Sequence, residues 1–343
     1  MSYKPEFTIT NDLLNYVAEI HASKEIIDNA PLVPSWERSF RNQAIVRTVH
    51  HSTAIEGNSL DIDEAQKIVS GDKIESFRTR DIMEIINYRK VIKYISDNKS
   101  KYLSEEFLLK VHTILGEKIL ASDMLGKFRE QNAVVVNSLT GEVVFDAVSV
   151  HDIQDEINDL IEWDINVKNC HPILRAGILH FEFVRIHPFV DLNGRSARIL
   201  ATWSMYRDGY DFKKFFSLEE YYDQDLSLYY DAIDSAHSGD LTHWLEYFTK
   251  GVGEELTRIK NKVLSLSMDR RLKLKVGQVA LNERQIKIID FLETYGEIKN
   301  PDFSEIFPKI SDDTILRDLN DLADKGIVKK RGRTRGAKYI LSQ

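Results

Sequence analysis

The feature that most constrains this chain is a polar loop over residues 187–198, because it lies between two segments with helical hydrophobic periodicity. Apolar residues recur at helical spacing on both sides of it: Leu174, Ile178, Phe181 and Val184 before, and Ile199, Trp203 and Tyr206 after. Pro188 predicts that the first helix ends by His187, and Gly194 permits a tight turn into the second. Unpaired N–H groups and the positive end of the helix dipole make such a helix start a natural site for an anion.

The side chains of this loop combine a base, a metal ligand and two cations. His187 can take a proton near neutral pH, and Asp191 is a hard oxygen ligand suited to a Mg²⁺ that also holds phosphates. Asn193 can donate to a phosphate oxygen, and Arg195 and Arg198 are close enough to reach past the same helix start. This set suits attack on a nucleoside triphosphate. The sequence has no Gly-rich Walker loop with its Lys, which excludes a P-loop protein.

Residues 187–198 resemble the Fic family motif, HPFx(D/E)GNGRxxR, and the similarity continues upstream through residues 180–186. The resemblance implies an all-α fold, a Fic-type helical bundle with a small β-hairpin flap. It also implies transfer of AMP from ATP to a Ser, Thr or Tyr hydroxyl of a target protein, including the chain itself, with Mg²⁺ as cofactor. In that reaction His187 would be the catalytic base and Asp191 the metal ligand. The nucleotide would be bound by Leu192 through its N–H, and by Asn193, Gly194, Arg195 and Arg198.

One position departs from the motif, because Leu192 stands where the family usually has Gly. The backbone N–H that would meet a phosphate is retained. A Leu side chain, however, adds bulk and is strained at positive φ. A degenerate nucleotide-binding site that no longer turns over is therefore the alternative to an active enzyme.

A second segment, residues 52–57, ends a helix that we predict over residues 38–56. Ser52 and Glu56 are four residues apart and so share one face of that helix. The run resembles the family's inhibitory motif, (S/T)xxxE(G/N), in the class whose inhibitory helix is N-terminal. The resemblance implies that Glu56 contacts Arg198 and occupies the place of the γ-phosphate. The alternative is a helix end with a solvated Glu56.

Two runs of β-forming residues flank the turn-rich residues 137–142, which predicts a β-hairpin in an otherwise helical chain. The resemblance implies that this hairpin is a flap, where Val135, Val136 and Asn137 pair with an extended target segment and place its hydroxyl near His187. The alternative is a plain surface hairpin.

A Tyr-rich segment follows residues 217–220, which form a helix-capping pattern. Tyr229 and Tyr230 are the better candidates there for contact with the adenine base. Core packing with polar tips is the commoner use of such tyrosines and stays the alternative.

We predict four parts along the chain. These are an N-terminal helical region with the inhibitory helix over 1–100, the Fic core over 101–267, a basic linker over 268–280, and a winged helix-turn-helix over 281–343. The expected recognition helix of the last part carries several acids, namely Asp312, Asp313, Asp318, Asp321 and Asp324. Because acids repel a phosphate backbone, we favour a protein-docking or dimer-forming module over DNA binding. A winged-helix transcriptional regulator with a nucleotide-sensing or degenerate core is the alternative function.

Composition sets the remaining bounds. The chain has 343 residues and a net charge of −8, and it is 43% hydrophobic, which is ordinary for a globular protein. Its one cysteine, Cys170, excludes an internal disulfide and fits a reducing compartment. We see no apolar run of membrane-spanning length and no signal-peptide core at the N-terminus. We therefore expect a cytoplasmic protein without membrane contact, and a homodimer is a further expectation.

Overall fold

The computed structural model describes residues 3–30, 32, 34–72, 78–99, 102–136, 143–276, 281–308, 310–332 and 337–342. The described chain is mainly helical, which confirms the predicted all-α class, and it forms two compact units. One unit comprises Met1–Asp28 and Arg41–Lys260, and the other Asn29–Phe40 and Asn261–Gln343. We describe each by itself.

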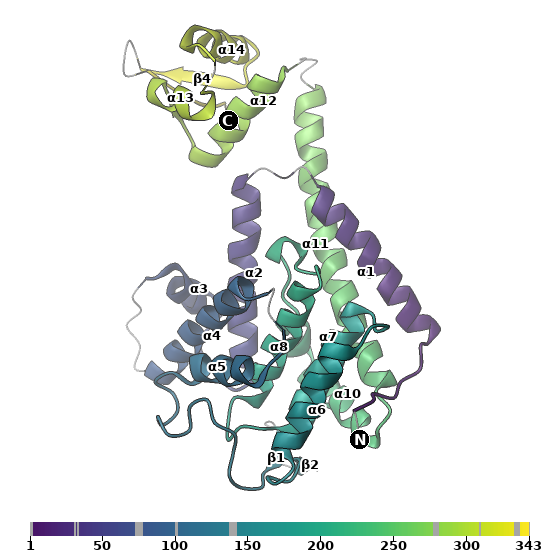
Figure 1. Cartoon of the computed structure of the whole chain (residues 1–343). Helices are drawn as coiled ribbons and strands as arrows, with labels where there is room; N and C mark the ends of the chain where they lie inside the picture. Colours follow the sequence, from purple (N-terminus) through teal and green to yellow (C-terminus); the bar gives the residue numbers. More distant parts are fainter. Residues whose placement is uncertain are drawn as a thin grey trace. The chain divides into compact units, whose positions relative to one another are not determined.

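The first unit carries the loop that the sequence singled out (Figure 1). Its helices and strands, some of which continue into the second unit, are α1 (Asn11–Asn29), α2 (Pro34–Ala54), α3 (Ile62–Ser70), α4 (Thr79–Asp97), α5 (Glu105–Gly116), β1 (Val134–Val136), β2 (Val143–Asp146), α6 (Ile153–Asn166), α7 (Pro172–Ile186), α8 (Asn193–Arg207), η1 (Phe212–Lys214), α9 (Glu219–Gln224), α10 (Leu226–Ser235), η2 (Ala236–Ser238) and α11 (Thr242–Val276). Residues 41–100, which we predicted as part of a separate N-terminal region, belong to the same compact unit as residues 101–260.

Helices α7 and α8 form the centre of this unit and lie side by side (Figure 1). Helix α7 is buried around almost its whole circumference, as expected of a core helix. Its start is fixed by Pro172 and by the side chain of His171, which accepts a hydrogen bond from the N–H of Ile173. Helix α8 packs against α4 and α5, where the rings of Trp203 and Phe107 lie 4.6 Å apart. These contacts hold the 187–192 loop between two buried helices.

The predicted hairpin is present as an antiparallel pair, β1 with β2. Val134 pairs with Asp146 and Val136 with Val143, with a register shift between Val135 and Val136. The strands thus match the expected flap in position. Asn137, the third predicted docking residue, lies outside the described residues.

In the second unit, α12 (Glu283–Tyr295), α13 (Phe303–Ile306) and α14 (Asp312–Asp324) pack on a small antiparallel sheet. The sheet has the strand order β3-β5-β4, with strands Ile298–Lys299, Lys338–Leu341 and Val328–Arg331. Helix and strand order are those that the winged-helix prediction requires, and that assignment stays a prediction, as does its favoured role in protein docking or dimer formation over DNA binding.

Two details of this unit differ from expectation. The run 268–276, expected as linker, continues α11 to Val276, because it contains strong helix formers and neither Gly nor Pro. Asp318 on α14 is buried and bonded to Arg284 at 2.7 Å, so it is not one of the exposed acids that we expected on that helix. No helix in the described residues is long and apolar enough to cross a membrane.

Candidate active site

The loop between α7 and α8 begins and ends in left-handed backbone. His187 has φ 50° and Leu192 has φ 71°. For residues with a Cβ this conformation costs about 1–2 kcal/mol each, so surrounding contacts must hold it. Leu192 gains such a contact by burying its side chain beside Gly116 at the end of α5. The positive φ that made Leu192 an unusual choice is therefore present, and packing offsets its strain.

His187 is positioned as a neutral base. Its Nδ1 lies 3.3 Å from the carbonyl oxygen of Val184. A carbonyl only accepts, so Nδ1 carries the proton and Nε2 keeps its lone pair. Burial lowers the pKa of His187 to about 4, which keeps the ring neutral at physiological pH. Within the described chain Nε2 has no hydrogen-bond partner, so it can receive a proton from a substrate.

Arg129 holds the backbone of this loop, a role that we did not foresee. Its Nε donates to the carbonyl of His187 at 2.8 Å, and its backbone N–H donates to the carbonyl of Pro188 at 2.8 Å. The other guanidinium nitrogens donate to Gln131 and Val148, which border the hairpin strands. One buried arginine thus joins the hairpin to the His187 loop. A single Arg in an irregular segment carries no sequence signal for such a role.

Asn193 differs from expectation. We expected its amide to donate to a phosphate, but Nδ2 donates to the carbonyl of Phe189 at 2.8 Å, and Oδ1 accepts from the N–H of Phe189 at 2.9 Å. Both ends of the amide are thereby used to close the loop. A phosphate at this helix start would meet backbone N–H groups instead.

Glu56 and Arg198 meet as the inhibitory motif implies. Arg198 Nη2 donates to Glu56 Oε1 at 2.8 Å, and Nε donates to Ser52 Oγ at 2.8 Å. The Arg198 side chain is 1% exposed and that of Glu56 is 29% exposed, so water reaches this ion pair only from the glutamate side. A Cβ placed on Gly194 would lie only 2.6 Å from Glu56 Oε1. The Glu56 carboxylate therefore lies on the first turn of α8, where an anion is favoured.

Arg195 is also paired, with a residue that the sequence did not reveal. Its Nη1 lies 3.0 Å from Oε1 of Glu84 on α4. Oε2 of Glu84 accepts from Asn58, two residues after Glu56. The Nε of Arg195 is buried and has no partner in the described part of the chain, so one donor stays uncommitted.

Asp191 is the one predicted metal ligand. Its side chain is 43% exposed, with Oδ2 3.4 Å from Arg80. Within the described residues no three His, Cys, Asp or Glu side chains gather as a ligand set. A single accessible carboxylate still fits Mg²⁺, because Mg²⁺ is commonly held by one or two carboxylates, phosphate oxygens and water.

The two tyrosines differ from each other. Tyr229 is buried, its hydroxyl lies 3.1 Å from Nε2 of His180, and its ring stacks on Tyr222 at 4.5 Å. It is therefore a core residue, and the alternative reading of packing with a polar tip holds for it. Tyr230 is partly exposed and stays a candidate for the base.

Part of the chain matches a known protein family and a set of curated relatives. Residues 102–205 match the Fic/DOC family model. The protein adenylyltransferase fic-1 of Caenorhabditis elegans is 28% identical over 210 residues, covering 59% of this chain and 38% of that protein. The protein adenylyltransferase Fic of Aedes aegypti is 26% identical over 221 residues, covering 60% and 40%. The chain thus spans about two fifths of the length of these relatives.

Two solved structures share the fold. A Fic family protein from Desulfovibrio desulfuricans G20 has a TM-score of 0.67 at 23% identity, covering 99% of this chain and 98% of that one. A structure of Fic-1 from C. elegans has a TM-score of 0.61 at 22% identity, covering 74% and 73%.

Proposed function

Since the chain contains a Fic domain over residues 102–205, we propose that it is a protein adenylyltransferase that Glu56 holds in an inhibited state. It moves AMP from ATP to a Ser, Thr or Tyr hydroxyl of a target protein. The observation that carries the proposal is the Glu56 carboxylate on the first turn of α8, paired with Arg198, in the loop where His187 Nε2 has no partner in the described residues. A carboxylate at a helix N-terminus occupies a position that also suits a phosphate.

In the reaction, the target hydroxyl oxygen attacks the α-phosphorus of ATP. The bond from that phosphorus to the bridging oxygen breaks, and pyrophosphate leaves. The hydroxyl proton passes to Nε2 of His187, whose Nδ1–H stays on the carbonyl of Val184. The backbone N–H groups at the start of α8 stabilise charge on the phosphates.

Asp191 would hold Mg²⁺, which neutralises charge on the phosphates when bound. Arg195 binds the outer phosphates through its uncommitted Nε, and Arg198 binds the γ-phosphate once Glu56 has left it. While Glu56 stays, ATP binds with its phosphates displaced from in-line attack. The β1–β2 hairpin aligns the target by strand pairing.

The test is transfer of label from ATP to protein. Glu56→Gly protein is incubated in lysate with ATP labelled at the α-phosphate and, separately, at the γ-phosphate. We expect bands that depend on His187 with the α-label only, since AMP and not phosphate is moved and lysate kinases give γ-labelled bands in every sample. Label from the γ-phosphate that depends on His187, or no difference in α-label between Glu56→Gly and Glu56→Gly/His187→Ala, would refute the proposal. Parallel reactions with CTP, GTP and UTP identify the nucleotide.

A further inference from the structure

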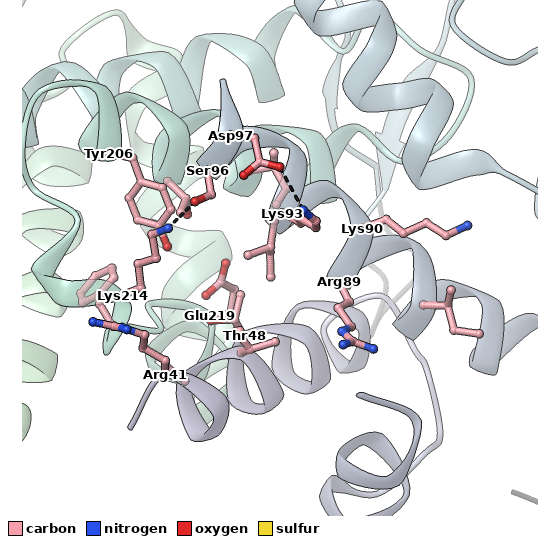
Figure 2. Close-up of a pocket in the computed structure, with 17 residues that line it drawn as sticks. Arg41, Thr48, Arg89, Lys90, Lys93, Ser96, Asp97, Tyr206, Lys214 and Glu219 are labelled. Atoms are coloured by element: carbon pink, nitrogen blue, oxygen red, sulfur yellow. Dashed lines mark hydrogen bonds and ion pairs between the residues drawn. The ribbon is translucent and has the colours of Figure 1, made fainter. Parts of the chain in front are cut away.

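A cavity of about 560 Å³ lies between α2, α4 and α8 (Figure 2). Its walls come from α2, α4, α8 and the segment 214–219. Small-molecule pockets typically measure roughly 300–1,000 Å³. Apolar side chains line much of it, including Ala44, Ile45, Ile86, Ile92, Ile199 and Phe216.

One side of the cavity carries two hydroxyls without partners in the described residues, next to a carboxyl that is already bonded. Thr48 and Tyr206 are each 7% exposed, and neither hydroxyl has a hydrogen-bond partner among the described residues. The Glu219 carboxyl is buried beside them and accepts from Tyr88 at 3.3 Å. Unpaired polar groups in an apolar pocket are costly unless a ligand or water bonds to them.

Cations lie on both sides of the cavity, Arg41 and Lys214 near Tyr206 and Glu219, and Arg89 and Lys90 on the other side (Figure 2). The lining residues include five cations, Arg41, Arg89, Lys90, Lys93 and Lys214, against two acids, Asp97 and Glu219. Lys93 pairs with Asp97 at 3.2 Å, whereas Arg89 has no ion-pair or hydrogen-bond partner in the described part of the chain. Figure 2 shows Lys93 and Asp97 across the cavity from Glu219 and Thr48.

We propose that this cavity binds a small aromatic acid that carries a hydroxyl at the far end, and that its binding loosens the inhibitory end of α2. The carboxylate meets Arg89, the ring lies between the apolar walls, and the hydroxyl bonds to Glu219 and Thr48. A planar guanidinium without a partner is well suited to a carboxylate.

The cavity shares its walls with the elements that carry the ion pair of the active site. Arg198 donates to Ser52 on α2, and Tyr88 on α4 donates to Glu219, which lines the cavity. The cavity also touches Thr48, one turn before Ser52, and Ile199, next to Arg198. A ligand seated against Thr48 and Ile199 displaces α2 and α8 next to Ser52 and Arg198, and so weakens the support that Ser52 gives to Arg198.

Binding is tested with para-hydroxyphenylacetate and its neutral isostere para-hydroxyphenylacetamide, by saturation-transfer NMR and titration calorimetry on the full chain. Since a charge-assisted bond contributes roughly 1.4 kcal/mol or more, we expect the acid to bind about tenfold more tightly than the amide. Arg89→Met should remove this preference, and Thr202→Trp, which fills the cavity, should abolish binding. Lys110→Met, an exposed cation on α5, is the matched control.

The link to α2 rests on the function proposed above and is tested separately. We expect the acid to speed hydrogen exchange of amides in the last turn of α2, and to raise AMP labelling by the wild type but not by Glu56→Gly. If no variant shows AMP labelling, but the acid binds and speeds hydrogen exchange as expected, the proposed function is wrong and the binding site stands. No binding of the acid, or binding indifferent to Arg89→Met and Thr202→Trp, would overturn the site.

Discussion

The two ends of the 187–198 loop are built in opposite ways. At the His187 end, Arg129 bonds to the backbone, and the imidazole Nε2 has no hydrogen-bond partner among the residues that the structure describes. At the arginine end, the functional groups themselves are taken, Arg198 by Glu56 and Arg195 by Glu84. Under the proposed function, His187 can therefore accept a proton as it stands, whereas Arg198 and Arg195 must first be released from their carboxylates.

This difference separates catalysis from its control. A neutral imidazole held by backbone bonds needs no conformational change before it acts. Under the proposed function, opening of the Glu56–Arg198 pair, whose arginine is buried, sets the fraction of competent molecules. The predictions below test each end in turn.

The largest effect is expected at the base. His187→Ala removes the proton acceptor and should lower AMP transfer by about 10²–10⁴-fold, the usual range for a general base. The measurement is the rate of α-label incorporation in the Glu56→Gly background. His151→Ala, at an exposed histidine, is the control and should keep full activity. A His187→Ala rate within twofold of the parent would mean that His187 is not the catalytic base.

Removing the backbone support is expected to have the next largest effect. Arg129→Met leaves the carbonyls of His187 and Pro188 without their donors and lets the imidazole shift. A displacement of the order of 1 Å can lower a rate by about 10²-fold. The measurement is kcat at saturating ATP, with exposed Lys127→Met as the neighbouring control. Unchanged kcat in a folded Arg129→Met protein would show that the loop holds its shape without this residue.

The arginine end is tested by Glu56→Gly. Loss of the carboxylate frees Arg198 and should raise self-labelling by about tenfold or more, within the range typical of coupling between sites. Glu56→Gln keeps the size of the side chain and removes its charge, so its self-labelling should lie between that of the wild type and that of Glu56→Gly. Equal labelling by wild type and Glu56→Gly, in a preparation that labels at all, would end the claim of inhibition.

The pH profile distinguishes a histidine whose pKa is lowered by burial from one with an ordinary pKa. Burial lowers the pKa of His187 from 6.5 to about 4, so the ring stays neutral as pH falls through 6. At pH 5.5 we expect less than a twofold loss of kcat/KM, whereas a histidine of ordinary pKa would lose about tenfold. A pH titration of the Glu56→Gly enzyme gives the midpoint. An acidic limb centred near 6.5 would contradict a buried neutral base.

The smallest effect is expected at Leu192. Leu192→Gly relieves left-handed strain of about 1 kcal/mol and gives up burial of about 2 kcal/mol, so it should destabilise the protein by about 1 kcal/mol. Urea unfolding measures the change. Labelling tests in the same variant whether bulk at this position slows turnover. A stabilised Leu192→Gly protein would show that strain outweighs the packing against α5.

The sequence predicted the helical class, the hairpin and the contact of Glu56 with Arg198, because each has a local pattern or a motif. It did not predict how buried polar groups find partners. Asn193 bonds to the Phe189 backbone and Tyr229 to His180, and both choices depend on tertiary packing. Glu84 and Arg129 were missed for the same reason, since each acts on residues far away in the chain.

Because Arg129 bonds to both the hairpin base and the carbonyl of His187, the two cannot drift apart without breaking a buried guanidinium contact. A polypeptide that adds a strand to this hairpin is thereby registered against the imidazole by residue spacing. Selection among neighbouring hydroxyls would then follow from strand register, in steps of one residue pair, rather than from a pocket shaped to one side chain.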